Sequence, residues 1–145
     1  MIINNLKIKV KKMSRKAKMP TKAHPSDAGV DLYSAAQYLI PVGGRALIRT
    51  GVAMEIPEGY VGFATGRSGK TVKEGLVGQL GIIDAGYRGE IGIMAFNFSG
   101  STLIVDPGDK VGQIVILPIP GIELEEAEEL SESDRGTNGF GSTGK

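Results

Sequence analysis

Short hydrophobic runs, rather than long amphipathic periods, set the pattern of this chain. Near the N-terminus, residues 6–11 alternate apolar and basic side chains with a period of two, as in a half-buried strand whose lysines face water. Short strands punctuated by Gly- and Pro-rich turns predict an all-β barrel or sandwich. The apolar runs are 30–32, 38–42, 46–56, 60–64, 76–83, 91–98, 102–105 and 111–119.

Helical signals are few and short. Residues 71–74 and 125–130 can each form one turn, and neither reaches the roughly 12 residues at which a helix is stable on its own. No linker or internal repeat divides the 145 residues, so one domain is predicted. We place this domain at 1–134, followed by a Gly-rich arm at 135–145, which is either a flexible tail or a flap that becomes ordered over a ligand.

Composition narrows the chemistry. The chain has no cysteine, which excludes disulfides, thiolate metal sites and cysteine nucleophiles, and it has a single histidine, His24. No apolar run approaches the ~18 residues that a membrane span needs, and the N-terminus lacks an apolar signal core. We therefore expect a cytoplasmic protein without a membrane partner.

Two oppositely charged segments lie behind the net charge of +1. Residues 7–22 contain eight Lys or Arg and no acid, and residues 123–134 contain seven Asp or Glu and no base. A basic segment can bind nucleic acid, but here no aromatic side chain is interleaved to stack on bases, and the alternating pattern favours a solvated strand. No nucleic-acid partner is expected.

Residues 64–71, Ala-Thr-Gly-Arg-Ser-Gly-Lys-Thr, nearly fit the phosphate-loop pattern. Only twelve residues, three of them glycine, separate this segment from Asp84, which is too little for the required long helix and crossover. The phosphate-loop fold is therefore rejected. Arg67, Ser68 and Gly69 still supply a bidentate cation, a hydroxyl and unhindered amides, as a polyphosphate cradle requires.

A tight turn at residues 84–86 lies between the apolar runs 80–83 and 91–98, which predicts a β-hairpin. Its tip carries the carboxylate of Asp84 and, three residues on, Tyr87. From the pattern alone, an equally good interpretation is that Asp84 merely forms the turn and Tyr87 is an ordinary cross-strand aromatic.

Five segments, in order, resemble the motifs of the homotrimeric dUTPase family, the all-β dUTP nucleotidohydrolases. The third, Gly-Ile-Ile-Asp-Ala-Gly-Tyr-Arg-Gly-Glu-Ile, and the Gly-rich fifth are the most specific. The resemblance implies a distorted jelly-roll barrel of short strands and a homotrimer whose active sites are shared between subunits. It also implies magnesium-dependent hydrolysis of dUTP to dUMP and pyrophosphate, which limits uracil in DNA. The five segments are 28–35, 66–69, 81–91, 107–114 and 135–144.

The resemblance also implies roles for individual residues. Asp84 orients and deprotonates the attacking water, and Tyr87 lies against the deoxyribose and excludes a 2′-hydroxyl. Asp31 reaches the magnesium through water and helps to position Arg67. The implied catalytic set is Asp84, Arg67, Gln113 and Asp31.

The implied substrate contacts fall into three groups. Backbone groups of residues 78–83 pair with the uracil edge, and Phe140 stacks on the base. Arg67, Ser68, Gly69 and Gln113 bind the α- and β-phosphates, while the arm closes over the γ-phosphate. The full substrate-binding set is Arg67, Ser68, Gly69, Gly78, Ile82, Ile83, Asp84, Tyr87, Gln113, Arg135, Phe140, Gly141, Ser142 and Thr143.

Several positions depart from the family pattern. Lys70 stands where an apolar residue is common, Gly78 where asparagine is common, and Lys110 where arginine is usual. Two alternatives stay open: a dCTP deaminase-like enzyme of the same superfold and a non-catalytic regulatory module. Residues 92–97 lack the acid that such deaminases carry beyond the third motif, and a regulatory module would be expected to lose Asp84, Arg67 or the tail.

Overall fold

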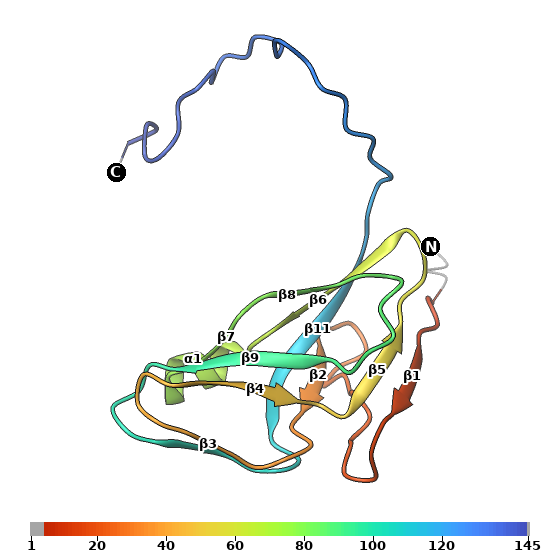
Figure 1. Ribbon diagram of the computed structural model, residues 1–145, viewed down its shortest axis with the longest axis vertical. Coiled ribbons are helices and arrows are strands. Elements are labelled where there is room, and N and C mark those ends of the chain that lie inside the picture. The colour runs from red at the N-terminus through yellow and green to blue at the C-terminus, as the bar shows by residue number, and fades with distance from the viewer. Residues whose placement is uncertain (1–4, 145) are drawn as a thin grey trace.

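The computed structural model describes residues 5–144, so the ends of the predicted domain and arm, 1–4 and 145, lie outside the described residues. Within 5–144 the chain forms eleven strands and one short helix, which confirms the all-β prediction (Figure 1). The elements are β1 (Lys9–Lys12), β2 (Val30–Tyr33), β3 (Tyr38–Ile40), β4 (Arg45–Arg49), β5 (Val52–Glu55), β6 (Tyr60–Thr65), α1 (Ser68–Glu74), β7 (Leu76–Gly78), β8 (Gly81–Ile83), β9 (Gly92–Asn97), β10 (Leu103–Val105) and β11 (Lys110–Pro118).

The strands pair into four small antiparallel sheets. Their orders are β2-β11-β6-β8, β4-β9-β7, β10-β3 and β1-β5. In the part of the chain that the structure describes, these pairings do not close into a barrel, so the protein is a body of short sheets packed around one core.

Alternation along the strands builds that core. In β9, Ile93, Ala95 and Asn97 are buried, and the residues between them are only partly covered. Asn97 is a polar residue at a position in the core where an apolar side chain is usual, and all of its polar side-chain atoms are hydrogen-bonded. Its Nδ2 donates to the carbonyls of Ile40 and Ser101, both at 2.8 Å, and its Oδ1 accepts from Ser99.

Two predicted runs prove to be interrupted. The run 46–56 breaks near Gly51, which has a φ of 69°, into β4 and β5. The run 76–83 breaks at residues 79–80 into β7, which pairs with β9, and β8, which pairs with β6. The predicted hairpin is therefore wrong in its pairing: β7 is the partner of β9, while residues 81–83 have crossed into another sheet.

The N-terminal strand forms as its alternating pattern predicts, whereas only one of the two predicted helical turns forms. β1 pairs with β5 and leaves its lysines exposed, with an ion pair of 3.5 Å between Lys9 and Glu55. The turn predicted at 71–74 is a longer helix, α1, which ends at the left-handed Gly75. The turn predicted at 125–130 is wrong: this acidic segment has no packed face to stabilise a helix.

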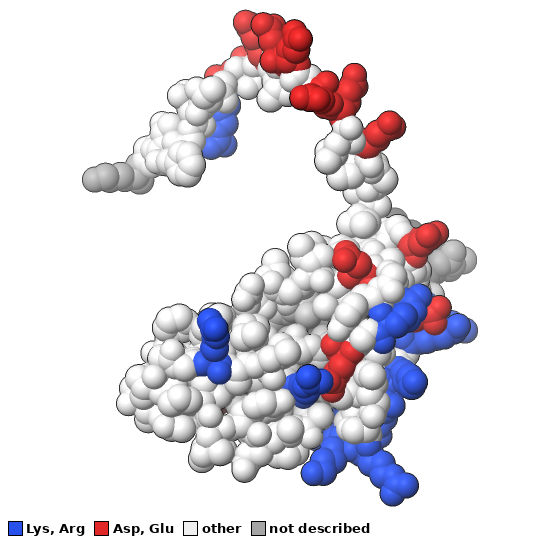
Figure 2. Space-filling view, viewed as in Figure 1, with Lys and Arg blue, Asp and Glu red and all other residues white. Residues whose placement is uncertain are grey.

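Beyond β11 the chain leaves the body and sweeps away from it, as Figure 1 shows in blue. Its hydrogen bonds after Ile119, which donates to Gly59, are local to the tail. Acidic side chains follow one another along this segment, whereas basic ones gather on the body near β1 (Figure 2). The boundary at 134 stays a prediction. Among the described residues, the seven-residue α1 is far too short to cross a membrane.

Candidate active site

A polar cleft of about 330 Å³ lies where β2, β11 and the start of α1 meet. Arg67, Ser68, Gly69, Asp31 and Gln113 all line it, so residues from three distant segments of the sequence come together there. The cleft is also lined by Ala23, Asp27 and Gly29, of which only Gly29 lies in one of the five motif segments.

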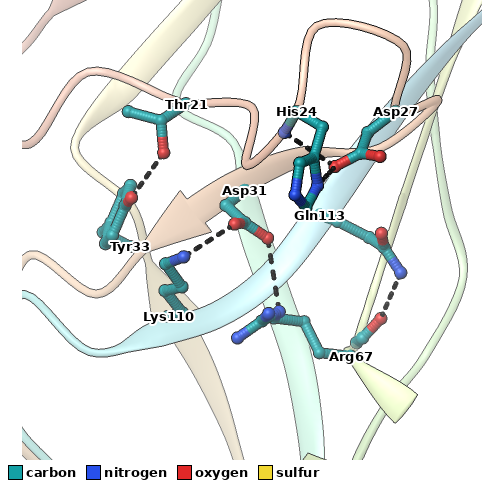
Figure 3. A network of polar contacts seen from close by, with 9 residues as sticks. Thr21, His24, Asp27, Asp31, Tyr33, Arg67, Lys110 and Gln113 are labelled. Carbon is teal, nitrogen blue, oxygen red and sulfur yellow. Dashed lines mark hydrogen bonds and ion pairs between the residues drawn. The ribbon is translucent and has the colours of Figure 1, made fainter. Parts of the chain in front are cut away.

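Asp31 lies at the centre of the polar network in this cleft (Figure 3). Its side chain is only 11% exposed and lies between two cations. Oδ1 is 3.3 Å from Nε of Arg67, and Oδ2 is 3.0 Å from Nζ of Lys110. A carboxylate so nearly buried needs compensation of this kind, because an unpaired charge there is strongly unfavourable.

A register shift in β11 places Lys110 in this network. Gln113 is opposite Asp31, and Lys110 is opposite Tyr33, with an irregularity between Lys110 and Gly112. In a regular strand, residues three apart point to opposite faces. The extra residue restores the face, so that Lys110 and Gln113 both point to the side of Asp31.

Gln113 lies across the cleft from the start of α1. Its Nε2 donates to the carbonyl of Gly66 at 3.4 Å. A Cβ at Gly29 would collide with Oε1 of Gln113 and lie 3.2 Å from its Cδ. The glycine at position 29 is what leaves room for this amide.

The loop from β6 into α1 presents the predicted phosphate-binding groups. Arg67 precedes the helix and has an extended backbone conformation. Its side chain forms the ion pair with Asp31 and is 36% exposed. Ser68 and Gly69 open the helix, where backbone N–H groups have no helical partner. Space around Gly69 is open. Lys70 is directed to Glu74, with 3.0 Å to both carboxylate oxygens.

Two glycines join this loop to the ribbon of β7. A Cβ at Gly78 would lie 2.5 Å from Cα of Gly66, and a Cβ at Gly66 would lie 2.6 Å from N of Gly78. Both distances are far below van der Waals contact. The two backbones therefore touch directly, and a larger side chain at position 78 would not fit this arrangement.

Asp84 and Tyr87 lie in a second cleft, of about 310 Å³, together with Ile82 and Ile83. The turn is held by the N–H of Tyr87, which donates to the carbonyl of Asp84 at 3.0 Å. The Tyr87 hydroxyl donates to the backbone carbonyl of Glu90 at 2.9 Å. These bonds fix the aromatic ring relative to the carboxylate of Asp84.

The far side of this turn is anchored by Glu90 and Arg88, which lie in the third motif but to which the sequence assigned no individual role. Glu90 accepts from Nη1 of Arg49 at 2.7 Å and from the N–H of Gly51 at 2.8 Å. Arg88 donates to the carbonyl of Ala85 at 2.6 Å. Asp84 and Tyr87 were assigned roles from the sequence, whereas Glu90 was not, because its partners Arg49 and Gly51 lie far away in the chain.

One chain does not bring the two clefts together. Asp84 follows Ile83, which pairs with Gly62 near the start of β6, whereas Arg67 follows the opposite end of the six-residue β6. Six residues of extended strand span about 20 Å at roughly 3.3 Å per residue. A carboxylate and a guanidinium so far apart cannot act on one phosphate from within a single chain.

The predicted tail residues are also separate from both clefts. Arg135 donates from Nε to the carbonyl of Asn138 at 2.8 Å, which is a contact within the tail. Phe140 is fully exposed and has a φ of 52°. Gly141, Ser142 and Thr143 lie in the same exposed segment.

A cleft that combines a guanidinium, a hydroxyl and helix N-terminal amides, on an antiparallel body with a hydrogen-bonded carboxylate turn, has the chemistry of an all-β protein that binds phosphate esters. The dUTPase family model matches residues 15–144 of the chain. The chain therefore belongs to the dUTPase family.

Individual relatives agree with the family match. A deoxyuridine 5′-triphosphate nucleotidohydrolase of Clostridium tetani is 46% identical over 140 residues, which cover 95% of this chain and 97% of the relative. A protein of the same name from Oryza sativa subsp. japonica is 41% identical over 94% of this chain and 80% of the relative.

Solved structures show the same fold. A mutant dUTPase of Staphylococcus bacteriophage 80alpha, with dUpNHpp, has a TM-score of 0.93 at 36% identity and covers 97% of this chain and 100% of its own. A mutant dUTPase from phage phi11 of S. aureus, described for the coordination of a structural Mg(II) ion, has a TM-score of 0.83 at 35% identity and covers 88% and 100%.

Proposed function

We propose that the chain hydrolyses dUTP to dUMP and pyrophosphate by attack of water on the α-phosphorus. The observation that carries this proposal is the cleft itself: Arg67, Ser68 and Gly69 lie together, opposite Gln113, within the residues that match the dUTPase family. These groups bind the α- and β-phosphates through a guanidinium, a hydroxyl and a backbone amide, which together suit several phosphate oxygens.

Asp84 is the group that orients the attacking water and accepts its proton. Its place on a turn held by backbone hydrogen bonds supports this role, because in-line positioning of the water contributes more than a large change in basicity. Tyr87, fixed through its hydroxyl, lies against the deoxyribose and leaves no space for a 2′-hydroxyl.

The uracil is read by the backbone of residues 78–83. This ribbon changes sheets at residues 79–80, which supports the role, because a backbone that leaves one ladder for another has groups that a base edge can pair with. Ile82 and Ile83 line the cleft beside Asp84. A base with the wrong order of donors and acceptors leaves buried polar groups unpaired there, which selects strongly against cytosine.

The tail completes the site from outside. Arg135, Ser142 and Thr143 bind the γ-phosphate, and Phe140 stacks on the base, with Gly141 giving the backbone a left-handed turn between them. The full exposure of Phe140 supports this role, because an aromatic ring without a partner in its own chain is available to a ligand.

Magnesium fits the polar cleft as part of a metal–nucleotide complex. Among residues 5–144, no cluster of three or more His, Cys, Asp or Glu could hold a metal alone, whereas Mg²⁺ commonly uses one or two carboxylates with substrate phosphates and water. Both oxygens of Asp31 already face cations, so Asp31 contacts the ion through water. When bound, magnesium offsets the charge of the triphosphate.

A homotrimer resolves the separation of the two clefts, because Arg67 of one copy and Asp84 of another meet in a shared site. An exposed apolar face supports association: Leu39 and Ile104 are directly paired across β3 and β10 and are 65% and 59% exposed. We place the enzyme in the cytoplasm, where a dUTP pool is accessible.

The activity is tested by incubating the protein with dUTP, UTP, dCTP or dTTP and Mg²⁺ and measuring pyrophosphate and the base of the product. Hydrolysis of dUTP alone is expected. Deamination of dCTP would instead identify a deaminase, and binding of dUTP without turnover would identify a regulatory module.

The shared site is tested by mixing two inactive variants. Asp84→Asn and Arg67→Ala are each expected to lose about 10²–10⁴-fold in kcat. Trimers refolded from a mixture of both contain sites whose Asp84 and Arg67 are both intact, so activity returns in part. Each variant refolded alone is the matched control, and a mixture no more active than these controls would place each site within one chain.

A further inference from the structure

We propose that Lys110 is a positioning residue that keeps the guanidinium of Arg67 available for phosphate. The inference deepens the proposed function, because it concerns the same cleft. Lys110 itself does not line that cleft, and it acts through the carboxylate of Asp31.

Arg67 and Lys110 contact different oxygens of the Asp31 carboxylate. The closest approach of Arg67 is from Nε to Oδ1 at 3.3 Å, and Lys110 holds the other oxygen, Oδ2, at 3.0 Å (Figure 3). Arginine and carboxylate commonly form a bidentate pair with two parallel N–H···O bonds. Lys110 competes for Oδ2, the oxygen that would complete such a pair, and the closest approach of Arg67 is the contact of Nε with Oδ1, so the guanidinium is not fully engaged by Asp31.

The charge of the network leads to the same conclusion. Asp31, Arg67 and Lys110 together carry one net positive charge beside Ser68 and Gly69, while Asp27, the other carboxylate that lines the cleft, contacts His24. The Asp31 side chain is 11% exposed, whereas those of Arg67 and Lys110 are 36% and 40% exposed. The surplus charge therefore lies on groups that a ligand can reach, and without Lys110 the pair of Arg67 and Asp31 would be neutral.

The backbone is built to bring Lys110 to this point. The register shift between Lys110 and Gly112 turns the lysine to the face of Asp31 and Gln113, which a regular strand would not do. The 40% exposure of Lys110 shows that the side chain is not needed to fill the core. An irregularity that re-aims one lysine toward the buried acid of a binding cleft fits a positioning role.

Three variants test the role. Lys110→Met keeps the length of the side chain without its charge, Lys110→Arg keeps the charge, and Lys16→Met removes a charge from the exposed basic segment as a matched control. The measurements are the Kd of dUpNHpp, the Kd of deoxyuridine, which lacks phosphate, and kcat and KM for dUTP, with thermal unfolding to check the fold.

We expect Lys110→Met to weaken dUpNHpp binding and raise KM about tenfold, the effect of one weakened charge-assisted contact, with a smaller change in kcat. Deoxyuridine binding stays unchanged, and Lys110→Arg restores dUpNHpp binding to within about threefold. Unchanged dUpNHpp binding in folded Lys110→Met would overturn the proposal, as would an equal loss for deoxyuridine, which indicates general distortion.

A double-mutant cycle gives an independent readout. Because Lys110 acts through Asp31, adding Lys110→Met to Asp31→Asn should cost far less dUpNHpp binding than adding it to the wild type. Additive losses would show that Lys110 acts on its own. If Lys110→Met does not fold, Lys110→Gln takes its place in the same cycle. Failure of the wild type to hydrolyse dUTP would sink the proposed function alone, since these binding measurements still decide the role of Lys110.

Discussion

The contact between Gly66 and Gly78 gives the sharpest prediction about how the site is held together. Gly78→Ala adds a single methyl group where the backbone of the phosphate-binding loop meets the ribbon of β7. That methyl carbon would lie 2.5 Å from Cα of Gly66 and 3.2 Å from Cγ2 of Ile93. The nearer obstacle is backbone, which cannot rotate away as a side chain can.

The magnitude follows from this geometry. Ordinary contact begins near 3.4 Å, so the two backbones must separate by about 1 Å, and overpacking of this kind costs typically 1–3 kcal/mol. We expect a loss near the upper end, about 3 kcal/mol, or roughly 6–12 °C in Tm for a chain of this length. Because the displaced loop carries Arg67, kcat/KM for dUTP should fall by up to about 10²-fold.

Thermal unfolding and steady-state hydrolysis measure the two effects on the same sample. Gly100→Ala is the matched control, since a Cβ at Gly100 meets no atom within 4 Å and the residue has an ordinary φ. Its Tm and activity should stay near those of the wild type. A Gly78→Ala protein that matches Gly100→Ala in both measurements would refute the reasoning.

Three further predictions concern the substrate contacts. Gly29→Ala should displace the Gln113 amide and raise KM for dUTP with little change in Tm, because only the end of a flexible side chain must move; an unchanged KM would contradict this. Tyr87→Ala should lower the preference for dUTP over UTP by at least about tenfold in a competition assay, since the ring no longer blocks a 2′-hydroxyl; an unchanged ratio would assign the discrimination elsewhere. Deleting 136–145 should leave the particle mass of the trimer intact by light scattering while kcat/KM falls about 10²-fold, and full activity would show that the tail is dispensable.

Features that depend on local pattern could be predicted from the sequence. The alternation in residues 6–11 gave β1 with its lysines exposed, and the Gly- and Pro-rich turns gave the short strands. The convergence of Asp31, Arg67 and Gln113 was predicted through the family motifs rather than through periodicity.

Features that depend on distant partners could not be predicted in this way. The change of sheets at residues 79–80 is decided by β6 and β9, which lie on either side of the ribbon in the sequence. Likewise, the register shift that aims Lys110 at Asp31 exists only in the pairing of β11 with β2. A strand alternates apolar and polar residues with a period of two whichever strand it pairs with. Periodicity in the sequence therefore does not show which strand will be the partner.

The polar cleft has one wall near the start of the chain and the other near its end, since Asp31 pairs with Gln113. During synthesis on the ribosome, β2 cannot pair until β11 has emerged. The pairing closes the long loop between these two strands, which is a slow step. A nascent chain that stops before residue 110 lacks both Lys110 and Gln113. The cleft between β2 and β11 therefore cannot form until the chain has been made through β11.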